Sequence, residues 1–153
     1  MNDVSAITPQ IYLSSYIDQS SMDFLREQDF QLIISMIGPT LPEEDFLDTG
    51  CKLLFLKTQD NFLFPIPIKK LLVGVETALP TLEKGHKIFI YCQQGKRRSV
   101  TMTASILIAQ GYSAVDAMKL IKEKRHLADP YRWYVKRKIL AFEKFWSQRK
   151  LNV

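Results

Sequence analysis

The sequence predicts an α/β fold: a central mixed or parallel sheet of about five strands, flanked by helices. Three observations support this prediction. The chain has 153 residues, 46% of them hydrophobic, which is enough for one buried core. Short apolar runs of the strand type alternate with amphipathic, helix-like runs along the chain. No internal repeat, linker or low-complexity segment interrupts this alternation, so we expect residues 1–153 to form one domain.

The strands are predicted from short apolar and β-branched runs that end at turn-forming residues. The third run, for example, ends at Gly38-Pro39, a pair typical of turns. We expect strands near Val4–Ile7, Ile11–Leu13, Gln31–Met36, Lys52–Leu56 and Lys87–Tyr91.

The first half of the chain is predicted to contain a helix between the second and third strands. It begins at a cap formed by Ser20 or Ser21, has Asp23 in its first turn and ends near Gln28. The later segment Leu41–Gly50 is predicted to be a short helix or a loop.

Two helices are predicted around the last strand. A long helix occupies roughly Ile68–Leu79, with Pro67 at its start and Gly85 beyond its end. A second helix-like run, Ser99–Gln110, ends at Gly111 and contains many small residues. That composition predicts a central helix packed closely on most sides.

Two more helices are predicted in the C-terminal part of the chain. Ser113, with Asp116 three residues later, is predicted to cap a helix over about Ala114–Lys124. The last helix is expected from about Pro130 to Gln148. Its apolar face contains Val135, Ile139, Phe142 and Trp146.

The most informative segment lies between the strand Lys87–Tyr91 and the helix that follows it. This segment contains Cys92, then Gly95, then Arg98 six residues after the cysteine, and finally Ser99. A strand, a tight loop and a helix N-terminus together present backbone N–H groups to an anion. A cysteine in that position is an expected nucleophile, because nearby cations and a helix N-terminus favour its thiolate form.

A phosphate ester is the substrate that this chemistry fits. The guanidinium of Arg98 offers two parallel donors to two phosphate oxygens, and the loop N–H groups can hold the others. The plainer alternative is a buried cysteine that merely ends a core strand, with basic residues at the surface after it. Cys92, Arg98 and Ser99 are expected to be catalytic, and the phosphate-binding residues are expected to be Gln93, Gln94, Gly95, Lys96, Arg97 and Arg98.

The segment from Cys92 to Ser99 resembles the Cys-x5-Arg-Ser/Thr loop of the cysteine-dependent protein tyrosine phosphatase superfamily, and in particular its compact dual-specificity type. The likeness covers most of the chain. The run at residues 11–15 resembles the early strand of that family, Gln31–Met36 its next core strand, and Arg125 with Asp129-Pro130 its C-terminal end. The resemblance implies hydrolysis of phosphotyrosine and phosphoserine/threonine in proteins.

A phosphatase of this kind also needs an acid that protonates the leaving oxygen. Asp60 is the best candidate because it follows the strand Lys52–Leu56 and lies 32 residues before Cys92, about the spacing of the dual-specificity family. Spacing alone would not separate it from Asp45 or Asp48. An Asx turn or a helix cap is the plainer role for Asp60.

The resemblance implies a mechanism through a cysteinyl-phosphate intermediate. Cys92 attacks phosphorus, Asp60 acts first as acid and then as base, and Ser99 donates a hydrogen bond to the departing sulfur. The plainer role of Ser99 is a helix cap. No cofactor or metal is expected, since the chain has two histidines and no cluster at ligand spacing.

Two departures from the family pattern affect this prediction. Most members have histidine before the cysteine, whereas Tyr91 stands here, and its hydroxyl could take over the histidine's hydrogen bond. Lys96 and Arg97 add charge beside Arg98. A basic residue at position 96 resembles phosphatases of inositol lipids and other polyphosphorylated substrates, while the plainer alternative is that both side chains face solvent. A phosphoinositide phosphatase is therefore an alternative function, and a catalytically weak phosphate-binding module is a second alternative.

Charge is unevenly distributed along the chain. Residues 1–76 carry five Lys/Arg and eleven Asp/Glu, while residues 77–153 carry sixteen and five, which gives the formal net charge of +5. The basic half contains the proposed loop and suits an anionic phosphoester partner. No nucleic-acid partner is expected, because aromatic residues do not alternate with basic ones in a known pattern.

The sequence also suggests a location and leaves several points open. No apolar run is long enough to span a bilayer, and the N-terminus lacks the features of a secretion signal, so a cytoplasmic location is expected. The basic residues of the last helix are most simply a solvated face, although peripheral membrane contact stays open. Cys51 is expected to be buried, with a disulfide to Cys92 as the alternative. The oligomeric state is not indicated.

Overall fold

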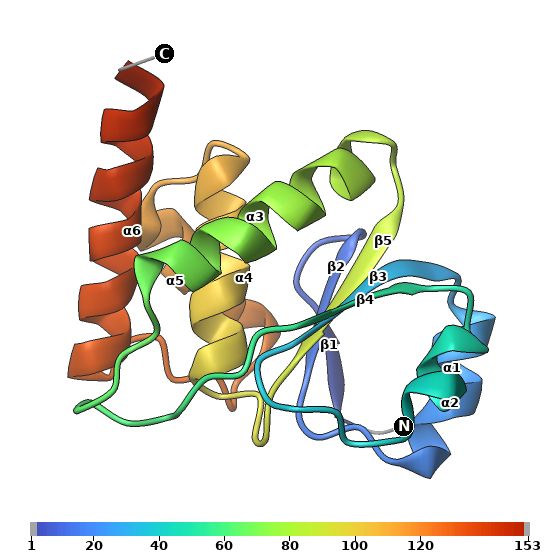
Figure 1. The fold of residues 1–153 in the computed structure, drawn as a ribbon. Coiled ribbons are helices and arrows are strands. Elements are labelled where there is room, and N and C mark those ends of the chain that lie inside the picture. The colour runs from blue at the N-terminus through green and yellow to red at the C-terminus, as the bar shows by residue number, and fades with distance from the viewer. Residues whose placement is uncertain (1–2, 152–153) are drawn as a thin grey trace.

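The computed structural model describes residues 3–151 and shows a five-stranded sheet with helices on both faces (Figure 1). The strand order is β1-β2-β5-β3-β4. β1 pairs antiparallel with β2, and all the other neighbours are parallel. The predicted α/β class with a mixed sheet is therefore confirmed. The strands are β1 (Val4–Ala6), β2 (Ile11–Ser14), β3 (Phe30–Ser35), β4 (Lys52–Phe55) and β5 (Lys87–Tyr91).

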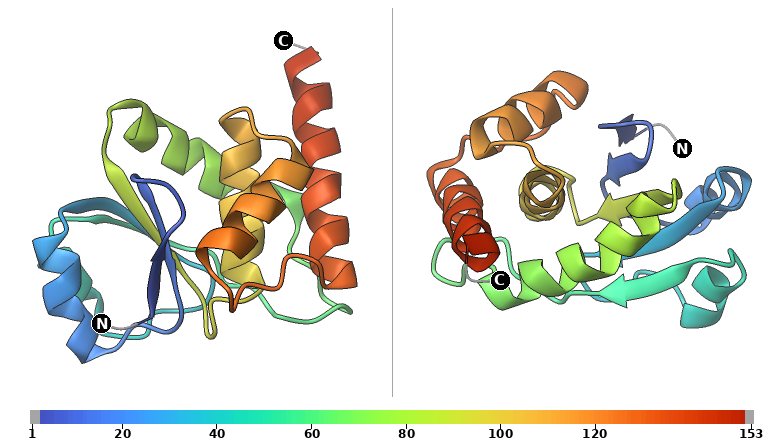
Figure 2. Two further views of the ribbon diagram at one scale, coloured as in Figure 1. Left: turned by 180° about the vertical axis from the view of Figure 1, so that it is seen from behind. Right: turned by 90° about the horizontal axis from the view of Figure 1, so that it is seen from above.

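The helices form two unequal layers (Figure 2). The α1 and α2 helices pack on one face of the sheet, while α3 to α6 cover the other. The helices are α1 (Met22–Glu27), α2 (Glu43–Leu47), α3 (Ile68–Glu83), α4 (Arg98–Ala109), α5 (Ala114–Lys124) and α6 (Trp133–Leu151), with a 3-10 turn, η1 (Gln19–Ser21), before α1.

The central strand β5 divides the core into these two layers. Because successive side chains of a strand point to opposite faces, Ile88 and Ile90 pack under α3 and α4, whereas Phe89 and Tyr91 pack under α1 and α2. Cys92 continues the first series and belongs to the larger cluster. The fold therefore places the thiol and the preceding tyrosine on opposite sides of the sheet.

The α4 helix is the central element of the larger layer. Its residues from Ser99 to Ile108 are all buried, as the small side chains of this segment predict. Such packing fixes the helix N-terminus directly after the loop that follows β5. Among residues 3–151, no helix has the length and apolar character needed to cross a bilayer.

Two predicted helix limits were wrong. The α3 helix continues through Pro80 to Glu83, because the burial of Leu82 outweighs the missing proline donor near the helix end. The last helix begins at Trp133 instead of near Pro130. The α1 helix begins at Met22 directly after Ser21, as predicted, although Ser21 makes no side-chain cap and the capping side chain is Asp18, which precedes η1.

Candidate active site

The structure places Cys92 at the carboxyl end of β5, the middle strand of the sheet. The side chain is buried, with 2% of the residue exposed. The backbone N–H of Gly95 donates to Cys92 Sγ at 3.2 Å, and Ser99 Oγ lies 3.1 Å from the same sulfur. The predicted nucleophile, the glycine of the loop and the first-turn serine of α4 thus meet at one atom. Both neighbours can donate hydrogen bonds to a negatively charged sulfur.

The side chain of Arg125 determines the orientation of the loop peptides. Its Nε donates to the carbonyl of Gly95 at 2.8 Å, and its Nη2 donates to that of Gln94 at 3.3 Å. The guanidinium is buried and forms an ion pair with Asp3, its Nη1 lying 2.9 Å from Oδ1. Arg125 is therefore a buried cation with a carboxylate partner that turns two loop carbonyls away from the sulfur.

Two further loop carbonyls accept hydrogen bonds from neighbouring segments. The N–H of Tyr16 donates to the carbonyl of Gln93 at 3.2 Å, and the N–H of Asp129 donates to that of Lys96 at 2.8 Å. In a trans peptide the carbonyl and the following N–H point in opposite directions. The N–H groups of residues 94–97 therefore point into the loop, where an anion would bind.

Gly95 is the residue at which the loop passes closest to the rest of the protein. Its φ of +65° lies in the left-handed region, and a Cβ there would come within 2.8 Å of the Ser14 backbone and 2.5 Å of Arg125 Nη2. Only glycine meets both requirements without strain. The tight turn that brings the Gly95 N–H to the sulfur therefore depends on this residue.

The loop surrounds an open pocket of about 230 Å³. Gln93 and Gln94 are exposed at its mouth, whereas Lys96, Arg97 and Arg98 are partly buried. The pocket brings together the predicted nucleophile, acid and basic residues, and it is lined by Asp60, Cys92, Gln93, Gln94, Lys96, Arg97 and Arg98.

A series of backbone hydrogen bonds places the predicted acid beside the loop. The N–H of Met36 donates to the carbonyl of Tyr91 at 3.0 Å, and the carbonyl of Met36 accepts from the N–H and Oγ1 of Thr58 at 3.2 and 2.6 Å. Arg98 Nη1 then donates to the carbonyl of Thr58 at 3.0 Å. Asp60 follows two residues later, so its position is tied to the end of β5.

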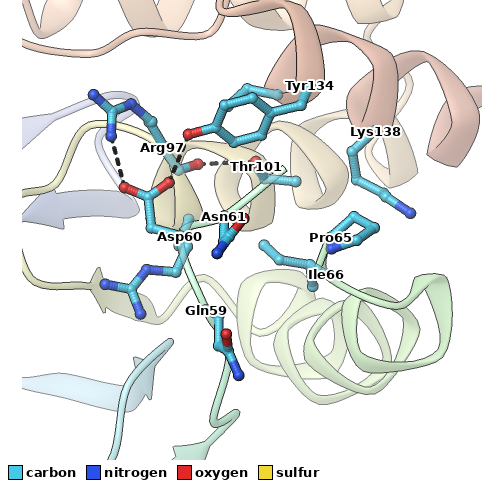
Figure 3. Close-up of a pocket in the computed structure, with 11 residues that line it drawn as sticks. Gln59, Asp60, Asn61, Pro65, Ile66, Arg97, Thr101, Tyr134 and Lys138 are labelled. Carbon is cyan, nitrogen blue, oxygen red and sulfur yellow. Dashed lines mark hydrogen bonds and ion pairs between the residues drawn. The ribbon is translucent and has the colours of Figure 1, made fainter. Parts of the chain in front are cut away.

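The carboxylate of Asp60 is held on both of its oxygens (Figure 3). Arg97 Nη1 lies 2.7 Å from Oδ2, and the hydroxyl of Tyr134 donates to Oδ1 at 3.0 Å. Burial and then the hydrogen bond to Asp60 raise the pKa of Tyr134. Burial opposes a rise in the pKa of Arg97, but the hydrogen bond and the charge of Asp60 outweigh it. The side chain of Asp60 keeps 26% exposure and borders the pocket.

The other two carboxylates considered from spacing do not reach the pocket. Asp48 forms an ion pair with Arg26 at 3.1 Å, and Asp45 lies on α2, which covers the opposite face of the sheet. Sequence reasoning did not assign a role in the site to Arg125 or Tyr134. Arg125 was noted only as part of the family resemblance, and its contacts to residues 3 and 94–95 join segments that are far apart in sequence.

Tyr91 does not replace a histidine that contacts the loop. Its side chain is buried on the α1 and α2 face, and its hydroxyl lies 3.4 Å from Thr40 Oγ1. Burial raises the pKa of Tyr91, so the phenol is neutral. The expectation that this hydroxyl takes over a hydrogen bond beside Cys92 was therefore wrong, because the alternation of β5 turns it to the other side of the sheet.

Cys51 cannot form a disulfide with Cys92. Both thiols are free, and Cys51 packs in the α1 and α2 layer at the start of β4, whereas Cys92 follows the end of β5. The two residues therefore lie at opposite ends of parallel strands and on different faces. The plainer prediction, a buried Cys51, is confirmed, and burial raises the pKa of its thiol.

Comparison with known proteins identifies the fold. A structure of PTPMT1 superimposes with a TM-score of 0.86 over 98% of this chain and 99% of that one, at 20% sequence identity. The human tyrosine phosphatase-like serine/threonine/tyrosine-interacting protein gives a TM-score of 0.78 at 20% identity, over 96% of this chain and 99% of that one. The chain has the fold of the dual-specificity phosphatases. The resemblance predicted from the Cys-x5-Arg loop is confirmed.

Sequence relatives give narrower support. The "Putative tyrosine phosphatase 123R" of Invertebrate iridescent virus 6 is 33% identical over 66 residues, which cover 42% of this chain and 46% of the viral protein. The match thus spans about half the length of that relative. No family model matches the chain. A second structure of PTPMT1, with a TM-score of 0.84 and 19% identity, contains PI(5)P; it covers 96% of this chain and 98% of that one.

We predict that Gly95→Ala destabilises the protein by more than the left-handed strain alone, which costs roughly 1–2 kcal/mol. The added Cβ also collides with the Ser14 backbone. Gly50→Ala is the matched control, since Gly50 has a φ of +77° but open space around it. Thermal unfolding followed by circular dichroism should give a lower Tm for Gly95→Ala than for Gly50→Ala. Equal Tm values would show that the loop does not crowd Ser14.

We predict that Tyr91→Phe leaves the reactivity of Cys92 unchanged. The hydroxyl contacts Thr40 on the far side of the sheet, so its removal should cost at most about 1 kcal/mol of stability. The measurement is the rate of alkylation by iodoacetamide as a function of pH, with Cys92→Ser protein as background for Cys51. A displaced pH profile in Tyr91→Phe would mean that the hydroxyl acts on the thiol after all.

Proposed function

We propose that this protein hydrolyses phosphate monoesters through a covalent intermediate on Cys92. One observation carries the proposal: the inward-facing N–H groups of residues 94–97, the sulfur of Cys92 and the side chains of Arg98 and Asp60 all border one pocket of about 230 Å³. A tetrahedral dianion requires such a set of donors around a nucleophile. One N–H of Arg98 donates to the carbonyl of Thr58, and the other N–H groups of its guanidinium can donate to phosphate oxygens.

In the first step, the thiolate of Cys92 attacks phosphorus in line with the ester oxygen. The S–P bond forms while the P–O bond to the leaving group breaks. Asp60 acts in this step in its protonated form, which requires that it give up the ion pair with Arg97. It passes its proton to the departing oxygen, so the alcohol or phenol leaves neutral. The N–H groups of the loop and Arg98 hold the three oxygens that do not leave. Because these donors are already oriented, little reorganisation accompanies the charge shift.

In the second step, water attacks the phosphorus of the thiophosphate. Asp60, now a carboxylate, takes a proton from that water, and the S–P bond breaks as inorganic phosphate forms. The electron pair returns to the sulfur of Cys92, where Ser99 Oγ at 3.1 Å and the Gly95 N–H at 3.2 Å can stabilise it. Ser99 therefore serves the leaving sulfur in this step rather than acting as a simple helix cap.

Two substrate classes have support. Phosphotyrosine and phosphoserine/threonine in proteins are the expectation from the resemblance, and the viral relative named as a tyrosine phosphatase supports it. Phosphoinositides are the second class, supported by Lys96 at the pocket wall and by the PI(5)P found in a PTPMT1 structure. Lys96 and Arg97 would bind additional phosphate groups of such a ligand only if they are not neutralised, and Arg97 is already paired with Asp60.

The proposal is tested by release of inorganic phosphate from a phosphotyrosine peptide and from dispersed PI(5)P, with EDTA present. We expect release by the wild type and none above background by Cys92→Ser. Binding of vanadate or phosphate by both proteins without turnover would instead identify a phosphate-binding module. Activity that disappears with EDTA would overturn the expectation of metal-independent hydrolysis.

Replacement of Asp60 by Asn should lower kcat by about 10²–10⁴-fold for substrates with alkyl leaving groups, because an amide cannot supply the proton. For p-nitrophenyl phosphate, whose leaving group needs little protonation, the loss should be much smaller. Asp48→Asn is the matched control and should leave both rates unchanged. Equal losses for good and poor leaving groups would assign Asp60 a structural role.

A further inference from the structure

An exposed apolar tip follows the proposed acid. Phe62, Leu63 and Phe64 stand two to four residues after Asp60, and they are 55%, 67% and 59% exposed. They lie in the long connection between β4 and α3, whose tip projects at the lower left of Figure 1, below the start of α6. Contact of three consecutive large apolar side chains with water is unfavourable, and such a patch on a surface loop is typical of an interaction site.

The start of α6 extends this apolar surface. Trp133 is 59% exposed and its ring centroid lies 5.8 Å from that of Phe62, while Tyr131 is 51% exposed. The next residue, Tyr134, is the one that donates to Asp60. We define the aromatic rim as Phe62, Leu63, Phe64, Tyr131 and Trp133. Phe62 follows Asp60 by two residues and Trp133 directly precedes Tyr134, so both segments of the rim continue from residues beside the proposed active site.

The same two segments concentrate positive charge. Residues 57–70 and 129–138 together carry seven Lys/Arg and two Asp/Glu, and the rest of the chain carries fourteen of each. The whole formal net charge of +5 therefore resides in these segments. Their two carboxylates are already paired with arginines, since Asp60 contacts Arg97 and Asp129 contacts Arg132.

We propose that the aromatic rim docks this protein on an anionic lipid bilayer, with the pocket facing the lipid headgroups. Aromatic side chains partition into the headgroup region of a bilayer, and flanking lysines and arginines are attracted to its negative surface. A bilayer supplies an apolar layer and a negative surface together. A protein partner would need both an apolar pocket for a projecting Phe-Leu-Phe tip and an acidic patch around it.

This inference rests on the proposed function and narrows its substrate. A rim inserted into the interface places Asp60 and Cys92 at headgroup level, so a phosphate monoester on a lipid headgroup reaches the loop without leaving the membrane. The structure of PTPMT1 with PI(5)P is consistent with such a ligand for this fold. The basic residues Lys136 and Arg137, predicted to be a solvated face, then face the lipid surface.

The test measures vesicle binding by catalytically inactive protein, so that it does not depend on turnover. Cys92→Ser protein is sedimented with vesicles of phosphatidylcholine alone, with added phosphatidylserine, or with added PI(5)P. The rim variant adds Leu63→Ser and Phe64→Ser. The matched control adds Tyr112→Ser and Val115→Ser, which are also exposed but lie beyond the far end of α4.

We expect binding to both kinds of anionic vesicle, weakened at least about tenfold by the rim variant and less than about twofold by the control. Added salt should weaken binding further. In the active protein, the rim substitutions should leave hydrolysis of p-nitrophenyl phosphate unchanged and lower hydrolysis of vesicle-borne PI(5)P.

Three results would overturn the docking proposal. The first is that the parent protein does not bind vesicles, and the second is that the parent and the rim variant bind them equally. The third is that the rim variant loses activity toward a soluble phosphopeptide while its vesicle binding is unchanged. The last result would identify a peptide-docking surface. Vesicle binding as expected without any phosphate release would instead contradict the proposed function and leave the docking surface established.

Discussion

The candidate site depends on one constraint, which is that the carbonyl groups of the loop after β5 must face outward. Each peptide whose carbonyl is held outside presents the next N–H to the interior of the loop. The buried guanidinium of Arg125 holds two of these carbonyls, and its charge is balanced by Asp3. Because the guanidinium is buried, loss of Asp3 would leave a buried charge without its carboxylate partner. The segments at residues 3, 14–16, 93–97 and 125–129 thus stabilise one another through this loop.

A second set of hydrogen bonds connects the segment that carries the nucleophile to the segment that carries the proposed acid. The carbonyl of Tyr91 accepts from Met36, the carbonyl of Met36 accepts from Thr58, and the carbonyl of Thr58 accepts from Arg98. These hydrogen bonds therefore form a continuous chain from the end of β5, through the segments after β3 and β4, to the start of α4. Asp60 lies two residues after Thr58, so this chain of hydrogen bonds positions it without a direct contact with Cys92.

The parts of the site that sequence could predict are those determined by local order along the chain. Cys92 follows an apolar strand and precedes a helix, and Asp60 follows another strand, so the carboxyl edge of a parallel sheet brings them together. Arg125 and Tyr134 contact the site through side chains from segments distant in sequence, and no periodicity indicates those pairs. The α3 helix passes Pro80 for a similar reason, because tertiary burial overrode a local signal.

The same reasoning explains how the loop can be ordered without a histidine before the cysteine. A side chain at position 91 lies on the α1 and α2 face, since β5 alternates and Cys92 takes the other face. The loop carbonyls already have donors in Tyr16, Arg125 and Asp129. Tyr91 is then free to fill the apolar layer beneath the sheet, where its ring packs against Phe89 at 6.4 Å. The residue before the nucleophile is therefore part of the hydrophobic core, and the loop is ordered by donors from other segments of the chain.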